Sequence, residues 1–196
     1  GTVSAISVTT PMGAFGLDEA GVTVEANGLV ADGLFREAFT LSGLTTPAGL
    51  VPEWATQPVP SALALDIKVT RINLLAPVAL LLDTVDFATG PADQAAFQGQ
   101  MMTAMMPEGV VDVTLAPGSI VAPIYELGYE AQMSAGMAAM PSGKATLTAK
   151  GMTEVQAALA AAPEDMRGQI APMLAMAEGM AKPGADGGLL WELEMT

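Results

Sequence analysis

The sequence contains no cysteine and no histidine among its 196 residues. Without cysteine the chain has no disulfide, no thiol nucleophile and no thiolate ligand for a metal. Without histidine it lacks the commonest general base and the commonest ligand of transition metals. Ser-His-Asp and Cys-His catalytic arrangements are therefore excluded. We expect no catalytic residues, no metal site and no cofactor.

Basic residues are also scarce, with 7 Lys and Arg against 21 Asp and Glu and a net charge of −14. The seven cations are scattered, and only Lys68 and Arg71 lie close together. Binding to phosphates needs clustered Lys and Arg, so nucleic acid is not expected as a partner. Anionic membrane surfaces are disfavoured for the same reason. The simplest interpretation of the acidity is a soluble surface.

Long hydrophobic runs are missing, although 51% of the residues are hydrophobic and only 14% are charged. This composition excludes a disordered chain, and residues 1–196 are enough for one domain with a core. The longest apolar run, 74–82, is interrupted by Pro77 and is far shorter than the roughly 20 residues of a membrane-spanning helix. No secretory signal opens the sequence. A strand-like run reaches Met195, so we expect a piece of a longer chain.

Apolar and polar residues alternate in several segments, as in strands with one wet face. This one-sided pattern predicts an antiparallel sheet rather than a buried parallel one. Turns are expected at 116–119 and 141–143, which makes residues 109–150 a three-strand meander. The clearest strands are expected at 63–70, 111–115, 127–133, 145–149 and 189–195, and weaker ones near 3–9, 21–26 and 35–41.

Helical spacing of apolar residues alternates with these strands along the chain. We expect a helix after a capping box at Thr153–Gln156, and a longer one that starts at Pro163 and is weakened by Pro172. Two earlier helices are expected near 74–87 and 91–106. The predicted fold class is α+β, with a curved, mainly antiparallel sheet and helices packed on one of its faces.

An internal duplication is a further expectation, because residues 40–45 resemble residues 148–153. Each segment ends a strand with Gly, a large apolar residue and Thr. Each is followed by a variable stretch and then by a strongly alternating strand. The related sub-units would cover about residues 1–90 and 91–196.

Three segments of the second half carry a resemblance to a known family. They are VTLAPGS at 113–119, SGKATLTAKG at 142–151, and GMAKPGADG at 179–187 before LWE at 190–192. Together they resemble the C-terminal part of domain-of-unknown-function family 2125, over about residues 60–196. That family is alphaproteobacterial and its members usually carry a secretory signal, so the resemblance implies a periplasmic location. It implies no activity and transfers no catalytic residue.

Methionine is enriched, at 14 residues. Thioethers suit Cu(I), but neither His nor Cys is present to complete a copper site, so we expect these side chains to fill irregular apolar cores. Alternatively they line an adaptable groove for an acyl chain or for an apolar segment of a partner. The three clusters are Met101, Met102, Met105 and Met106; Met133, Met137 and Met140; and Met173, Met176 and Met180.

A few polar and aromatic side chains complete the candidates. Asp83 and Asp86, three apart on an expected helix, could share a face for acid–base hydrolysis or calcium binding, although a hydrated helix end is the simpler interpretation. Tyr125 and Tyr129 are expected to share one face of a strand. Trp54 and Trp191 are expected to anchor a core, with Trp54 partly exposed because it lies among prolines. Cross-strand pairing with acids is expected for Lys68, Arg71, Lys144 and Lys150.

These observations predict a non-catalytic cell-envelope protein. It would be a structural or interaction module, or a carrier of an apolar ligand such as lipid, and an enclosed apolar cavity would favour the carrier. The alternative is a carboxylate-dependent hydrolase of an envelope glycan, which needs two facing carboxyl groups about 5 to 9.5 Å apart. Exposed edge strands at either terminus also invite pairing into a homo-oligomer.

Overall fold

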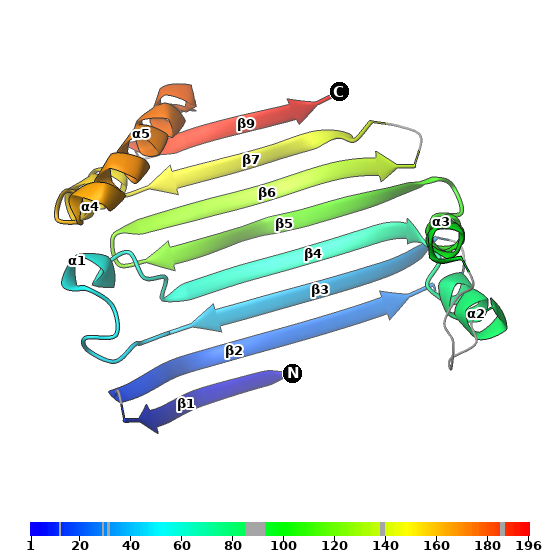
Figure 1. The fold of residues 1–196 in the computed structure, drawn as a ribbon, viewed down its shortest axis with the longest axis horizontal. Coiled ribbons are helices and arrows are strands. Elements are labelled where there is room, and N and C mark those ends of the chain that lie inside the picture. The colour runs from blue at the N-terminus through cyan, green and yellow to red at the C-terminus, as the bar shows by residue number, and fades with distance from the viewer. Residues whose placement is uncertain (12, 29, 31, 85–92, 138–139, 185–186) are drawn as a thin grey trace.

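The computed structural model describes residues 1–11, 13–28, 30, 32–84, 93–137, 140–184 and 187–196. Within them, nine strands form one sheet in the order β1-β2-β3-β4-β5-β6-β7-β9-β8 (Figure 1). All neighbouring strands are antiparallel, which confirms the expected sheet type. The strands are β1 (Thr2–Thr10), β2 (Gly13–Asn27), β3 (Gly33–Ser42), β4 (Ala62–Ile72), β5 (Val110–Ala122), β6 (Tyr125–Gly136), β7 (Ser142–Lys150), β8 (Lys182–Pro183) and β9 (Leu189–Met195).

The helices lie at the two ends of the strands (Figure 1). Helices α2 and α3 stand beside one end, while α1, α4 and α5 stand beside the other, and the middle of the sheet has no helix over it in this view. The α+β class is confirmed, but helices packed over one face are not seen. The helices are α1 (Glu53–Thr56), α2 (Leu75–Thr84), α3 (Gln94–Met105), α4 (Met152–Ala160) and α5 (Glu164–Met180).

The meander predicted for residues 109–150 is present as β5, β6 and β7, but one of its turns was wrongly placed. Residues 116–119 do not form a turn. They lie inside β5, where the register with both β4 and β6 shifts. The missing N–H of a proline is tolerated at such a bulge, so Pro117 does not end the strand. The chain reverses instead at residues 123–124.

The bulge in β5 is held together by Tyr129 on the neighbouring strand. The Tyr129 hydroxyl donates a 2.7 Å hydrogen bond to the carbonyl oxygen of Ala64 on β4. Its ring passes beside Gly118, where a Cβ atom would lie 2.6 Å from the ring and 2.5 Å from the Ala64 oxygen. Glycine is therefore required at residue 118 to let the tyrosine cross the strand.

Two predicted helix starts differ from the structure. The residue preceding α4 is Gly151, in the left-handed region with φ 79°, so Thr153 lies inside the helix and forms no capping box. Pro163 occupies the N-cap of α5 rather than its first turn, and the helix continues through Pro172. The end predicted for the helix at 74–87 and the start predicted at 91 fall in 85–92, outside the described residues.

The expected duplication has a counterpart in the topology but stays a prediction. Strand β3 pairs with β4, and β7 pairs with β9, after intervening segments of different length. Gly43 and Gly151, which follow β3 and β7, both have left-handed φ values of 67° and 79°. The two segments thus leave their strands in the same way.

The buried core is small for a chain of this size. Among the described residues the buried apolar side chains are Ile72, Met106, Ala122, Ala149, Leu159 and Ala162. The accessible surface is 12188 Å², whereas a compact 19.9 kDa monomer exposes ~8,700 Å². The excess of ~3,500 Å² relative to that scaling arises because most of the sheet is a single layer with two exposed faces.

The methionine and tryptophan expectations are met only in part. Met106 is buried, but Met173, Met176 and Met180 on α5 are 63 to 67% exposed, so a core position is wrong for that cluster. Trp54 and Trp191 are half-buried rather than core anchors. The indole N–H of Trp191 donates a 2.9 Å hydrogen bond to the carbonyl oxygen of Ala177, which ties β9 to α5.

Candidate functional site

One face of the sheet is lined almost entirely by apolar side chains, and we call it the apolar face. Directly paired residues of an antiparallel sheet point to the same side, so the register of each pair extends this face from β2 to β9. The one charged side chain that this register places among its described members is Glu37. The apolar members are Ala20, Val22, Val24, Ala26, Phe35, Phe39, Leu41, Leu63, Leu65, Ile67, Val69, Val111, Val113, Leu115, Ile120, Ala122, Tyr125, Leu127, Tyr129, Ala131, Met133, Ala135, Ala145, Leu147, Ala149, Leu189, Trp191, Leu193 and Met195.

Many of these side chains are open to solvent. Leu147 in β7 is 41% exposed, Leu193 in β9 is 52% exposed, and Val24 in β2 is 61% exposed. Most of the others are half-buried by their strand neighbours. A soluble monomer rarely exposes a contiguous apolar patch larger than a few hundred Å², and larger patches mark interaction sites.

Tyr125 and Tyr129 lie on this face together, as the sequence predicts. Burial raises the pKa of both phenols, so their hydroxyl groups stay neutral and non-nucleophilic near neutral pH. Tyr129 uses its hydroxyl to bridge the β5 bulge. These features describe packing residues rather than catalytic ones.

The opposite side, which we call the polar face, carries most of the ion pairs. Arg36 on β3 binds Asp66 on β4 through two hydrogen bonds, 2.9 Å from Nε and 2.6 Å from Nη2. Its Nη1 also lies 3.8 Å from Glu25 on β2. The hydrogen bond from Arg36 lowers the pKa of Asp66. Sequence reasoning missed Arg36, although its position opposite to the apolar residues of β3 was a usable signal.

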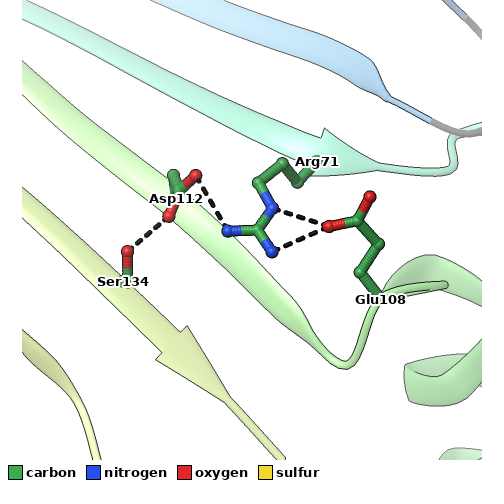
Figure 2. A network of polar contacts seen from close by, with 4 residues as sticks. All are labelled: Arg71, Glu108, Asp112 and Ser134. Atoms are coloured by element: carbon green, nitrogen blue, oxygen red, sulfur yellow. Dashed lines mark hydrogen bonds and ion pairs between the residues drawn. The ribbon is translucent and has the colours of Figure 1, made fainter.

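A second network joins the end of β4 to the two strands beyond it (Figure 2). Arg71 binds Glu108, before β5, at 2.7 and 3.0 Å and Asp112 in β5 at 3.3 Å. The hydroxyl of Ser134 in β6 donates to the other oxygen of Asp112. The hydrogen bond from Ser134 is the largest cause of the lowered pKa of Asp112, and Arg71 adds to it.

Arg71 reaches these acids because its backbone is left-handed. The preceding residue, Thr70, points to the polar face. Strict alternation would therefore place the Arg71 side chain on the apolar face. Its φ of 63° and the register shift opposite Gly33 redirect the side chain. The cross-strand pairing expected for Arg71 is confirmed, as is that of Lys144 with Glu194 at 3.4 Å.

We expect the free energy of unfolding to fall as the pH is lowered from about 4 towards 2. Asp66 and Asp112 have pKa values below those of unfolded aspartate. Their contribution is complete above the unfolded pKa of about 3.9 and is lost as the pH falls through the lower folded pKa. Urea unfolding at several pH values between about 4 and 2 measures this fall in the free energy of unfolding.

The variant Ser134→Ala removes the largest cause of the Asp112 shift and should make this decline shallower. Ser142→Ala is the matched control, because Ser142 faces Ser134 across β6 and β7 and is exposed. A decline in Ser134→Ala as steep as in the parent protein would contradict the role of the network.

Hollows on the molecule lie away from the centre of the apolar face. Depressions of about 360 and 190 Å³ are lined mainly by polar-face residues of β4 to β7. One of about 220 Å³ lies between α4 and α5, and one of about 390 Å³ lies where β7 meets β8 and β9. These hollows are open to solvent and do not form an enclosed apolar chamber.

The carboxylate pair predicted from the sequence lies only partly within the described residues. Asp83 is exposed in the last turn of α2, and Asp86 lies outside the described residues. In the described part of the chain, no group of three or more acidic side chains is placed to hold a metal ion. Across the same residues, none of the helices is both long and apolar enough for a membrane span.

Comparison with known proteins adds no assignment. No family model, curated protein or solved structure matches this chain. The resemblance to domain-of-unknown-function family 2125 therefore stays a hypothesis based on its three sequence segments.

Proposed function

We propose that this chain is a non-catalytic interaction module whose apolar face binds a second apolar protein layer. The observation that carries the proposal is the continuous apolar face of β2 to β9, with Leu147, Leu193 and Val24 exposed. Single sheets with one apolar face are stable in proteins when another layer covers that face. The second layer would bury part of the surface that exceeds the area of a compact monomer.

The shape of the face supports a protein partner over a lipid. A ligand-binding site is usually concave and surrounds most of its ligand. The depressions described above lie on the polar face, between helices and at the sheet end. A broad face without an enclosed chamber is better matched by a second layer than by a carried acyl chain.

The location belongs to the same proposal. The family resemblance supports the periplasm, and the absence of cysteine is compatible with it. Within the periplasm, the acidic polar face would stay in contact with solvent while the apolar face is covered.

Nile red, a neutral dye that fluoresces in apolar surroundings, tests whether the face is available. We expect dye binding by dilute native protein and a several-fold loss in Leu147→Asp. The matched control is Thr148→Asp, the next residue of β7, which is exposed on the polar face and should keep the signal. Equal signals from all three proteins would contradict the proposal, as would a stoichiometric lipid in an organic extract of the protein.

A further inference from the structure

We infer that the layer covering the apolar face is a second copy of this chain, so that two sheets pack face to face as a sandwich. The inference rests on the proposed function, because it names the partner of the same face. It is supported by the area of the face, by the placement of charge, and by the way large and small side chains alternate.

The area of the face is sufficient for a stable dimer. Five strands, β4 to β7 and β9, form its centre. With strands ~4.8 Å apart and ~30 Å long, this centre covers ~700 Å² on each copy. Two copies would then bury ~1,400 Å² together, which lies within the range of specific, stable protein–protein interfaces. Such a contact would remove about a fifth of the excess accessible surface of each copy.

Charge on the molecule is arranged so that two apolar faces can meet. The ion-paired residues of β3 and β4, Arg36 and Asp66, stand on the polar face, and so do Lys144 and Glu194 of β7 and β9. The apolar-face positions of β4 to β7 and β9, all within the described chain, are uncharged. Each copy has a net charge of −14, but these charges lie outside the centre of the contact and do not oppose it.

Glu37 limits where the copies overlap. It lies on β3 opposite Ile67, on the apolar side, and is exposed. Burying a carboxylate without a partner is costly, so Glu37 belongs at the rim of the contact. Strands β4 to β7 and β9, whose apolar-face positions are uncharged, then form the centre of the contact.

The side chains at this centre are self-complementary in size. Ala131 and Ala145 are paired across β6 and β7, so two small side chains lie side by side there. Met133 and Leu147 stand beside this pair on the same two strands. In a two-fold contact the same surface is used by both copies, so the large side chains of one copy can pack over the small pair of the other. Sheets packed in this way lie ~10 Å apart with strands inclined by ~30°.

A competing mode of self-association uses the edge of the sheet. All but the last residue of β1 are exposed, and the strand carries no charged side chain, which is typical of an edge that can pair with another strand. Edge pairing would leave the apolar face open. Variants can separate the two modes, because Val8 lies on β1 and Leu193 lies on the apolar face of β9.

The test is sedimentation velocity of the whole chain over a thousand-fold concentration range, with Nile red fluorescence measured on the same samples. We expect a concentration-dependent dimer whose formation displaces the dye. Leu193→Asp should shift the dimerisation midpoint at least tenfold to higher concentration, while Glu192→Gln, at the adjacent polar-face position, and Val8→Asp should not. Circular dichroism confirms that each variant keeps its sheet.

Three results would overturn the inference. If the parent protein stays monomeric while its dye binding is lost in Leu147→Asp, the second copy is wrong but the proposed docking face stands. If the protein is monomeric and dye binding is insensitive to Leu147→Asp, both fail. A dimer broken by Val8→Asp and not by Leu193→Asp would assign self-association to the β1 edge and overturn the face-to-face arrangement.

Discussion

Replacing Gly151 by alanine is expected to lower the free energy of unfolding by ~3 kcal/mol, from backbone strain together with overpacking. Gly151 joins β7 to α4 with a left-handed φ of 79°, a conformation that costs an L-residue free energy. A Cβ atom there would also collide with the backbone carbonyl of Ile124, in the turn between β5 and β6. Backbone atoms cannot move aside as a side chain could. Urea denaturation would measure the loss.

The matched control for this variant is Gly168→Ala. Gly168 lies within α5, and a Cβ atom built on it meets nothing within 4 Å. Alanine in a helix interior is favoured over glycine by ~1 kcal/mol, so this control should be slightly more stable than the parent protein. Similar effects of the two substitutions would show that the junction at Gly151 is not constrained as described.

The second large effect is expected for Gly118→Val, with a loss of ~2 to 3 kcal/mol from overpacking and strain. The added side chain would meet the ring of Tyr129 and the carbonyl oxygen of Ala64. Either the ring leaves its place or β5 separates from β4, and both changes break the contact that holds the bulge. Thermal unfolding of the purified variant measures the effect.

Tyr129→Phe isolates the hydrogen bond from the packing at the same bulge. It keeps the ring but removes the hydroxyl that donates to the Ala64 oxygen, so we expect a smaller loss of ~1 kcal/mol. If Gly118→Val destabilised the protein no more than Tyr129→Phe, the close approach of ring and glycine would not be the controlling feature.

The positions of the strands could be predicted from the sequence because each strand shows its apolar side by alternation. Leu63, Leu65, Ile67 and Val69 form one of the clearest runs, and all four lie on the apolar face. Alternation assigns residues to two sides of a strand, but it does not reveal whether anything covers the apolar side. The sequence interpretation assumed that the helices do, and the structure places them at the strand ends (Figure 1).

Local backbone features account for most of the other differences. Pro117 and Gly118 have the composition of a turn, but the bulge and the Tyr129 contact, which depend on two other strands, keep them in β5. Thr153 and Gln156 match a capping box, but the left-handed Gly151 takes the N-cap position and starts the helix two residues earlier. In both cases tertiary contacts or backbone handedness outweigh a valid local signal.

The apolar face was the part of the candidate site that sequence came nearest to predicting. The sequence hypothesis of an adaptable apolar surface was attached to the methionine clusters, whereas the exposed apolar surface of the structure is a face of the sheet. Only Met133 of its cluster has a place on the apolar face by strand register. The face is formed mainly by β-branched residues, leucine and alanine, which a strand pattern contains whether its apolar side is covered or not.

The strand order has a consequence for how the molecule would fold and open. From β1 to β7, each strand pairs with the strand next to it in the sequence, so most strand contacts span short loops, which favours rapid folding. Two pairings cross long insertions that contain two helices each: β4 pairs with β5 across residues 73–109, and β7 pairs with β9 across residues 151–188. Local opening should begin at the exposed β1 edge and move inward one strand at a time, leaving β4 to β7 as the most protected unit.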